Sequence, residues 1–395
     1  MDAFATLNTQ YQYIETQEAL DALCERLAEH EFISLDTEFV RTKTLYPLLG
    51  LIQIFDGKQV YLIDNTVMQS LASLKALAIN PNVVKVIHSC SEDLDAISYN
   101  VGSFPTPIFD TQIAAHFLNL GNSLGYANLV EKLCNVSLDK TESRTDWLAR
   151  PLRKEQLEYA SADVTYLYKV YEILKAEVQQ KGFLNMVIDE AQLMVDKKLN
   201  AVPEDNAYLN YSNAWKLAPK NLYALQLLAG WRLQLAREQN ITLNFILREN
   251  VILEIAQKLP KSPNQLSRMY GITRKQIRLY SDTVLGIVRQ VEMADESAYP
   301  DRIERLINFP LYKNASSEIK RQIMEVAEKT GLPESAIASK KQINDVLKYT
   351  WFEKSDLEDR QLKPDLLMGW RRELLGARIS ELFSESGKYH ARRSL

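Results

Sequence analysis

The sequence predicts a multidomain protein in which an α/β domain with a mixed five-stranded sheet is followed by two all-α domains. Three observations support this architecture. Up to about residue 195, short apolar runs alternate with helical patterns, which is typical of strands covered by helices. From about Asn210 onward the chain has an almost wholly helical pattern. At 395 residues the chain is also too long for one compact core.

Five segments of the first part have the composition of β-strands, namely Phe32–Phe39, Leu51–Phe55, Val60–Ile63, Val83–Ile87 and Pro107–Phe109. Asp56 and Gly57 form a turn signal between the second and third segments, which predicts a hairpin there. Helical patterns follow at Ser91–Tyr99, Thr111–Leu118, Gly125–Cys134 and Lys154–Gln180.

The helical part contains an internal repeat. Three apolar positions, Ile246, Ile252 and Ile255, correspond to Ile337, Ile343 and Val346 at an offset of 91 residues. The "VLG" at position 284 corresponds to the "LLG" at position 374 at an offset of 90 residues. This pattern predicts two copies of a helical domain of about eighty residues. We therefore expect domains at residues 1–200, 210–292 and 300–385.

Composition narrows the class of protein. A hydrophobic fraction of 46% and a charged fraction of 25% are ordinary for a soluble protein, and no apolar run is long enough to cross a membrane. The start, "MDAFATLNTQ", lacks the basic segment of a signal peptide. The three cysteines, Cys24, Cys90 and Cys134, are widely spaced, which favours a reducing cytoplasm and argues against disulfides or a zinc site. We expect a cytoplasmic monomer.

The net charge of −4 conceals an asymmetry along the chain. Residues 210–290 contain 12 basic and 4 acidic residues, a surplus of +8, which leaves −12 for the rest. A basic module attached to an acidic one is typical of nucleic-acid binding. The alternative is a solvated helical surface with a chance excess of basic residues.

Four acids and a tyrosine are candidates for a catalytic or metal-binding site. Asp36 and Glu38 project from the same face of one strand, where two carboxylates repel each other unless a cation lies between them. Ser89 and Glu92 have the spacing of a capping box, so Asp93 is expected in the first turn of a helix, either as a ligand or as a complement to the helix dipole. Tyr159 and Asp163 lie one turn apart on a predicted helix.

These acids predict a site for hard cations. Active groups of sheet proteins gather where strands end and helices begin. Carboxylate oxygens without cysteine or paired histidine favour Mg²⁺ or Mn²⁺, and a pair of such ions is the usual arrangement for cutting phosphodiesters. The sequence therefore predicts two divalent metal ions, Mg²⁺ or Mn²⁺, at this site.

Three motifs, "SLDTEF", "HSCSEDL" and "YASADVTYL", resemble those of the tyrosine branch (DEDDy) of the DEDD exonucleases, which are DnaQ-like. The segment "KTESRTDWLARPLRKEQLEYASADV" is very similar to the ribonuclease D family, and the helical repeats resemble the HRDC domains that accompany it. The resemblance implies an RNase H-like fold and metal-dependent 3′→5′ exoribonuclease activity that releases 5′-mononucleotides. It further implies trimming of the 3′ ends of tRNA precursors and other small structured RNAs.

The same resemblance assigns a role to each candidate catalytic residue. Asp36 would contact both metal ions, and Glu38 and Asp163 would complete the site that holds the attacking water. Asp93 would serve the second ion. Tyr159 would orient the nucleophile, because a phenol is a poor base at neutral pH.

Seven further residues are candidates for contacts to RNA: Thr37, Phe39, His88, Lys140, Arg144, Trp147 and Arg150. An aromatic ring such as Phe39 suits base stacking but serves equally in a core. His88 at a strand end is equally suited to local hydrogen bonds. The basic residues of the stretch before the third motif suit phosphate contacts.

Two alternatives to an exoribonuclease stay open. The carboxylate chemistry does not read the sugar, so a DNA exonuclease of the same superfamily would carry the same acids. A catalytically inactive RNA-binding protein is the other alternative, and the presence of all four acids and the tyrosine argues against it.

Overall fold

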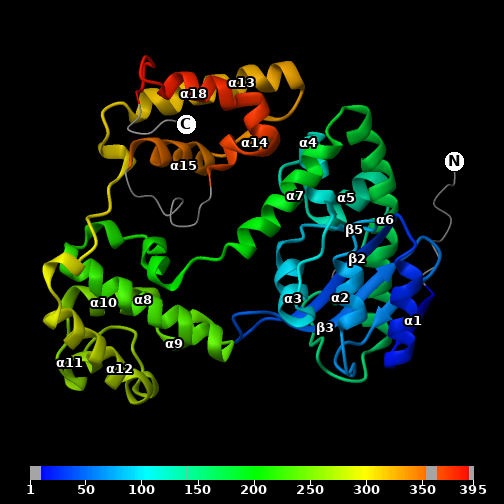
Figure 1. The fold of residues 1–395 in the computed structure, drawn as a ribbon. Coiled ribbons are helices and arrows are strands. Elements are labelled where there is room, and N and C mark those ends of the chain that lie inside the picture. Colours follow the sequence, from blue (N-terminus) through cyan, green and yellow to red (C-terminus); the bar gives the residue numbers. More distant parts are fainter. Residues whose placement is uncertain (1–9, 140, 353–362, 391–395) are drawn as a thin grey trace. The chain divides into compact units, whose positions relative to one another are not determined.

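The computed structural model describes residues 10–139, 141–352 and 363–390 of the chain (Figure 1). The chain divides into two compact units. The first comprises residues 1–42, 46–199 and 324–338, and the second comprises residues 43–45, 200–323 and 339–395. Each unit is described by itself.

The first unit is built on a mixed sheet with the strand order β1-β4-β3-β2-β5-β6. Its strands are β1 (Tyr11–Ile14), β2 (Phe32–Val40), β3 (Leu48–Phe55), β4 (Val60–Ile63), β5 (Val84–Ile87) and β6 (Ile108–Asp110). β3 runs antiparallel to both β2 and β4, which confirms the predicted hairpin, and the other pairs are parallel. The predicted five-stranded sheet was one strand short, because β1 has four residues and pairs with β4 at the sheet edge.

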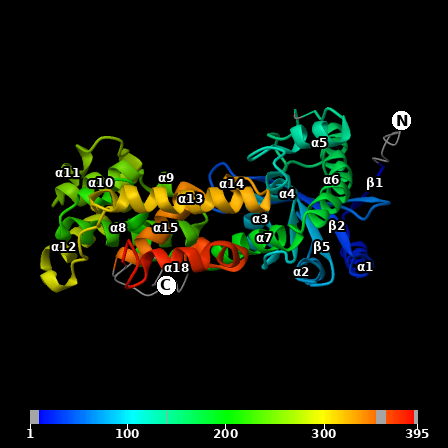
Figure 2. The same ribbon diagram turned by 90° about the horizontal axis from the view of Figure 1, so that it is seen from above.

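Helices cover both faces of this sheet. They are α1 (Gln17–Leu27), α2 (Ala72–Ala78), α3 (Ser91–Val101), α4 (Thr111–Phe117), α5 (Tyr126–Cys134), α6 (Lys154–Gln180) and α7 (Leu184–Leu199). Figure 2 shows α5 and α6 on one side of the sheet and α1 and α2 on the other.

Alternation along the central strands decides which face each side chain joins. Ile33 and Leu35 of β2 pack with α1, α2 and α3 in one core. Leu51 and Phe55 of β3 pack with Val164 of α6 in the other core. In the register of the sheet, Glu38 lies opposite Leu51, Asp36 opposite Gln53, and Ser34 opposite Phe55. The α6 side of the sheet therefore receives Ser34, Asp36 and Glu38, whereas Thr37 points toward α3.

The rest of the described chain is helical. Its helices are α8 (Pro219–Gln239), α9 (Leu243–Ile246), α10 (Glu249–Lys258), α11 (Pro263–Ser267), α12 (Arg274–Met293), α13 (Tyr312–Thr330), α14 (Glu334–Ile337), α15 (Lys340–Trp351), α17 (Gly369–Arg371) and α18 (Ala377–Phe383). Short 3₁₀ turns lie at Glu204–Asn210, Ala214–Lys216, Glu296–Ala298, Leu306–Asn308 and Asp365–Leu367, and a π-helical turn at Arg372–Gly376.

The predicted repeat is visible in these helices. α9 and α10 are followed at the same offset by α14 and α15, and both pairs join a four-residue helix to a longer one. All six residues that define the repeat are buried: Ile246, Ile252, Ile255, Ile337, Ile343 and Val346. The apolar spacing therefore marks equivalent core positions.

Two further predictions concern the whole chain. Cys24, Cys90 and Cys134 are free and buried. Among the helices of the described residues, none is both long enough and apolar enough to span a membrane.

Candidate active site

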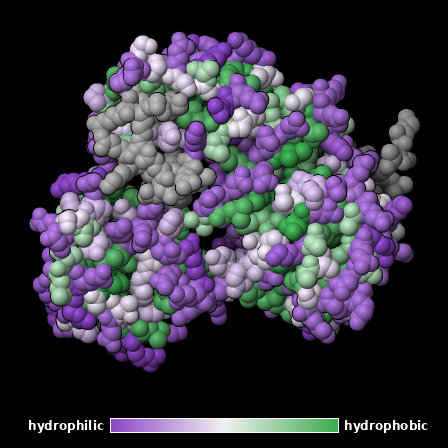
Figure 3. Space-filling view, viewed as in Figure 1, coloured by the Kyte–Doolittle hydropathy of each residue, from purple (hydrophilic) through white to green (hydrophobic). Residues whose placement is uncertain are grey.

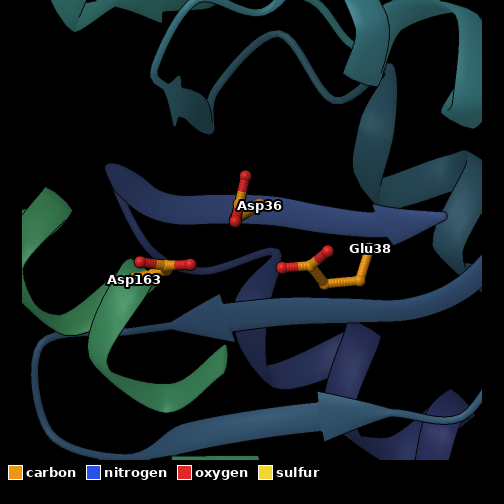
Figure 4. A group of neighbouring side chains, drawn as sticks. All are labelled: Asp36, Glu38 and Asp163. Atoms are coloured by element: carbon orange, nitrogen blue, oxygen red, sulfur yellow. The ribbon is translucent and has the colours of Figure 1, made fainter. Parts of the chain in front are cut away.

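Three of the four predicted acids meet between β2 and α6. Asp36, Glu38 and Asp163 each place a carboxylate oxygen within 4.8 Å of the others. Figure 4 shows the Glu38 and Asp163 carboxyl groups pointing toward one another, next to the strand that carries Asp36. Glu38 and Asp163 are buried, and Asp36 is partly exposed. The structure thus gathers oxygen ligands from two segments that are far apart in the sequence.

The fourth acid, Asp93, lies in the first turn of α3 and is buried. Its carboxylate accepts a hydrogen bond from the Thr37 hydroxyl, on the strand residue between Asp36 and Glu38. Repulsion from Asp36 contributes to the raised pKa of Asp93, after the larger effect of burial. Asp93 is therefore electrostatically part of the cluster, although it lies outside the group of three.

The start of α3 differs from the prediction. Ser89 was expected to cap this helix, but the cap residue is Cys90, whose side chain makes no capping hydrogen bond. Ser89 instead adopts a left-handed conformation, with φ of 56°. The Asp110 carboxylate accepts from the backbone N–H groups of Ser89 and Cys90 at 3.0 and 2.8 Å. The capping-box prediction was wrong, because the helix begins one residue later than expected and Asp110, at the end of β6, accepts from the Ser89 N–H that Glu92 was expected to bind.

Burial and mutual repulsion shift the acids toward their protonated forms. Burial raises the pKa of Asp36 to about 6. Burial, followed by repulsion from Asp36, Asp163 and Asp93, raises the pKa of Glu38 to about 10. The pKa of Asp163 is also raised well above its ordinary value, first by burial and then by Asp36. Within the described chain, no lysine or arginine forms an ion pair with any of the four acids.

This cluster fits hard divalent cations. Its donors are carboxylate oxygens, which Mg²⁺ and Mn²⁺ prefer, and its negative charge has no compensation from the described basic side chains. Gln53, opposite Asp36 in the sheet, is fully buried, and neither polar atom of its amide has a hydrogen-bond partner in the described structure. An unsatisfied buried amide beside compressed carboxylates is expected of a site that is completed by a ligand.

Tyr159 lies one helical turn before Asp163 on α6 and is half-buried. Burial raises the pKa of its phenol, and the neighbouring Asp163 raises it further. The Trp147 ring lies beside it, with 6.2 Å between ring centroids. Tyr159 is therefore a neutral hydrogen-bond donor that is held between a carboxylate and an indole.

Trp147 and Arg150, which were predicted to contact RNA, are instead engaged within the protein. Trp147 is 1% exposed and belongs to the core beneath α6. The Arg150 guanidinium donates to both oxygens of the Asp64 carboxylate at 2.6 and 2.7 Å, and to the carbonyls of Gly50 and Trp147 at 2.7 and 2.9 Å. These contacts fasten the segment before α6 onto the sheet.

The structure gives different surroundings to Phe39, His88 and Arg144, which were also predicted to contact RNA. Phe39 is partly buried and packs against the core on the α1 side. The His88 ring is hydrogen-bonded through Nδ1 to the Thr111 hydroxyl at 2.9 Å. Arg144 is exposed and forms no ion pair within the described residues. Lys140 lies outside the residues that the structure describes.

Sequence reasoning passed over three residues beside the acids. Ser34 and Gln53 lie on the same sheet face as Asp36, so strand alternation identifies them once the acids are recognised. Tyr126, at the start of α5, donates a hydrogen bond to the backbone carbonyl of Asp163. No local pattern indicates that contact, because it joins residues 37 positions apart.

Comparison with known proteins agrees with this geometry. A family model described as 3'-5' exonuclease matches residues 11–179, which include all the acids of the site. A model of the HRDC domain matches residues 222–288, and a model of the C-terminal HRDC domain of ribonuclease D matches residues 310–379. The fold and the site thus define a 3′→5′ exonuclease with helical accessory domains.

Whole-chain relatives identify the family. The chain is 40% identical to ribonuclease D of Escherichia coli strain K12 over 375 residues, which cover 95% of this chain and 99% of that protein. It is 32% identical to ribonuclease D of Pseudomonas paraeruginosa over 370 residues, covering 93% and 96% of the two chains. The chain belongs to the ribonuclease D family and is a hydrolase, a 3′→5′ exoribonuclease.

A solved structure extends the likeness to three dimensions. The crystal structure of the Escherichia coli ribonuclease D, described as an exoribonuclease involved in structured RNA processing, superposes with a TM-score of 0.90. It is 39% identical, and the match covers 96% of this chain and 100% of that one. The arrangement of an α/β domain followed by helical HRDC domains is therefore shared with a solved relative.

Proposed function

We propose that this protein removes nucleotides from the 3′ ends of RNA by hydrolysis with two divalent cations, Mg²⁺ or Mn²⁺, releasing 5′-mononucleotides. The observation that carries the proposal is the meeting of three carboxylates within 4.8 Å, with raised pKa values and no paired cation in the described chain. Bound cations would compensate this charge and supply an activated water and stabilisation of the leaving oxygen.

Each residue of the site has a proposed part in this reaction. Asp36 would contribute to holding both ions. Glu38 and Asp163 would help to hold one of them, and Asp93, oriented by Thr37, would serve the other. Tyr159 would donate a hydrogen bond that orients the attacking water, because its raised pKa excludes it as a base.

The first helical domain is proposed to hold the body of the RNA. Of its basic residues, Arg268, Arg274, Lys275 and Arg278 are exposed and form no ion pair within the described chain. The surface around α11 and α12 is predominantly hydrophilic on the face in Figure 3. Such a patch suits phosphate contacts, which fix a substrate without reading its bases.

The description of the Escherichia coli relative supports structured RNA as the substrate class. We propose tRNA precursors and other small structured RNAs as substrates, and a cytoplasmic monomer as the working form. The proposed boundaries are residues 1–200 for the exonuclease domain, 210–292 for the first HRDC domain and 300–385 for the second.

The proposed function is tested by following the degradation of matched 3′-extended RNA and DNA, with and without Mg²⁺. We expect stepwise shortening of the RNA from its 3′ end, slower shortening of the DNA, and none in excess chelator. Faster shortening of the DNA than of the RNA would favour the DNA exonuclease alternative. Absence of cleavage under all conditions would favour an inactive RNA-binding protein.

A matched pair of variants connects the activity to the site. Asp36→Asn removes a charge from the cluster and should lower the rate at least about a hundredfold. Glu158→Gln removes a charge from the exposed face of the same α6 helix and should leave the rate unchanged. A normal rate for Asp36→Asn would contradict the assignment of the active site.

A further inference from the structure

Two side-chain hydroxyl groups hold the α6 helix at the turn that carries Asp163. The Tyr126 hydroxyl donates to the backbone carbonyl of Asp163, and the Ser34 hydroxyl donates to the carbonyl of Val164 at 2.7 Å. Both carbonyls lie inside α6, where each is also in position to accept the N–H four residues later. A carbonyl oxygen has two lone pairs, so these bonds add to those of the helix.

We propose that Ser34 and Tyr126 are positioning residues, which hold Asp163 against Asp36 and thereby set the affinity of the carboxylate cluster for divalent cations. Neither residue contacts the reacting atoms. This inference rests on the proposed function, because it concerns the binding of the cations that the reaction needs.

Ser34 joins the two elements that supply the ligands. It lies in β2 two residues before Asp36, so its side chain projects from the same face of the sheet. It is fully buried, and its hydroxyl lies 2.7 Å from the Val164 carbonyl and 3.4 Å from that of Phe55. This contact fixes the spacing between the strand of Asp36 and the residue after Asp163.

Tyr126 holds the same turn from another element. It is the first residue of α5, which packs against α6. The His88 ring lies beside its ring, with 5.4 Å between centroids, and His88 is itself hydrogen-bonded to Thr111. The contact with His88 thus helps to fix the orientation of the Tyr126 ring and the position of its hydroxyl. Anchors from β2 and α5 together restrict both sliding and rotation of α6.

The cluster needs such anchors because its members repel one another. The carboxylate oxygens of Asp36, Glu38 and Asp163 lie within 4.8 Å of one another, and ionised carboxylates at this distance repel each other. Without a cation, this repulsion acts to separate α6 from β2. A site that is held at the binding geometry loses less free energy when the ions bind, because no rearrangement is needed.

The test uses the full-length protein with Tyr126→Phe, Ser34→Ala and the double variant. Each single change removes one hydroxyl and keeps the rest of the side chain. The control is Tyr61→Phe. Tyr61 lies on strand β4, outside the metal cluster, and its hydroxyl donates to the Asp56 carboxylate at 3.1 Å. The primary measurement is the rise in melting temperature with Mn²⁺ alone, which reports ion binding without turnover.

We expect each single variant to raise the Mn²⁺ concentration for half of the maximal temperature gain by about three- to tenfold, the equivalent of removing one hydrogen bond. The double variant should raise it further. At low Mn²⁺ the kcat on a short single-stranded RNA should fall and should recover at high Mn²⁺, with KM unchanged. Tyr61→Phe should leave the Mn²⁺ requirement as in the wild type.

The possible failures are distinguishable. If the variants only melt earlier and keep the wild-type Mn²⁺ requirement, the two hydroxyls are structural and the inference is wrong. An equal change in Tyr61→Phe would likewise overturn it, because general loosening would then explain the result. If the wild type itself gains no stability from Mn²⁺, the proposed function fails instead.

Discussion

Tyr159 is a neutral donor at the edge of a cluster of acids. The pKa of its phenol is raised by burial and by Asp163, so Tyr159→Phe removes a hydrogen bond and no charge. We expect this variant to lose on the order of ten- to a thousandfold in kcat and to keep the wild-type stabilisation by Mn²⁺. Rate measurements check the loss in kcat, and melting curves with Mn²⁺ check that the stabilisation by the ion is kept.

Tyr166→Phe, on the same helix, is the control for that experiment, because its hydroxyl is not part of the cluster. It should leave both the rate and the Mn²⁺ response unchanged. A loss of Mn²⁺ stabilisation in Tyr159→Phe would show that the phenol is a ligand or supports one, and would contradict a purely orienting role.

The acids predict an unusual dependence of stability on pH. Their pKa values rise on folding, for Asp36 from 3.8 to about 6 and for Glu38 from 4.5 to about 10, chiefly through burial. The folded protein without metal therefore holds protons that the unfolded chain has released. Its free energy of unfolding should fall as the pH rises from about 4 through 6 and onward toward 10.

Melting curves between pH 5 and 8, with chelator or with Mn²⁺, check this. Cations bind the ionised carboxylates, so the gain in melting temperature from Mn²⁺ should grow with pH. Other groups also titrate, so the double variant Asp36→Asn, Glu38→Gln is the reference, and its pH slope should be smaller. Equal slopes in the two proteins would contradict the raised pKa values.

Individual residues show where sequence reasoning reaches its limit. Alternation along a strand was enough to predict that Asp36 and Glu38 share a face, and the structure confirms it. The spacing of Ser89 and Glu92 suggested a capping box, but the Asp110 carboxylate accepts from the N–H groups of Ser89 and Cys90 instead. That carboxylate reaches the helix start only after β5 and β6 have paired. Local spacing cannot include such a tertiary partner.

At the scale of elements, β3 and the segment before α6 approach each other at Gly50. A methyl group at this position would lie 2.3 Å from the Trp147 carbonyl oxygen, so only a glycine fits without movement of the backbone. The Gly50 carbonyl also accepts from Arg150. This contact holds Trp147 beside Tyr159, so the packing at Gly50 helps to position a residue of the active site.

Gly50→Ala should therefore displace the Trp147 segment. We expect a loss of about 1–3 kcal/mol in the free energy of unfolding and a fall in kcat of roughly ten- to a hundredfold. Denaturant unfolding and single-turnover rates measure the two effects. The control, Gly286→Ala in α12, meets open space apart from Arg289 and should be neutral or slightly stabilising. A fully active Gly50→Ala would refute the connection.

Long apolar and helical patterns were sufficient for most elements of the α/β domain. The predicted helix Lys154–Gln180 has the observed bounds of α6, and Val60–Ile63 those of β4. β1 was missed because four residues with little apolar character become a strand only by pairing with β4. Trp147 and Arg150 were predicted to lie in a loop and to contact RNA. Trp147 instead packs against Gly50, and Arg150 binds Gly50 and Asp64, which no local pattern indicates.

For the whole molecule, the central question is whether the basic first helical domain touches the substrate. Replacing Arg274, Lys275 and Arg278 with alanine removes three exposed charges at the start of α12. We expect weaker binding to a tRNA-sized RNA. The slope of log K against log[salt] should become shallower by roughly 0.7 to 0.9 for each phosphate that the protein no longer neutralises.

A control variant with the same change in charge distinguishes direct contact with RNA phosphates from long-range electrostatic attraction of the RNA. Lys313, Lys320 and Lys329 are exposed on α13, and their replacement with alanine should leave the slope nearly unchanged. Cleavage of a short single strand should be unaffected in both triple variants. If both variants or neither changed the slope, the basic residues at the start of α12 would have no specific part in holding RNA.

The proposed activity depends on the cations that the four acids are proposed to hold. Counting the Mn²⁺ ions bound per chain by equilibrium titration, at a pH where the carboxylates ionise, tests this most directly. We predict two bound ions per chain for the wild type and fewer for Asp36→Asn. As the Mn²⁺ concentration increases, the number of bound ions and the activity should rise together. Full activity with no bound ion, or an unchanged count in Asp36→Asn, would contradict the account.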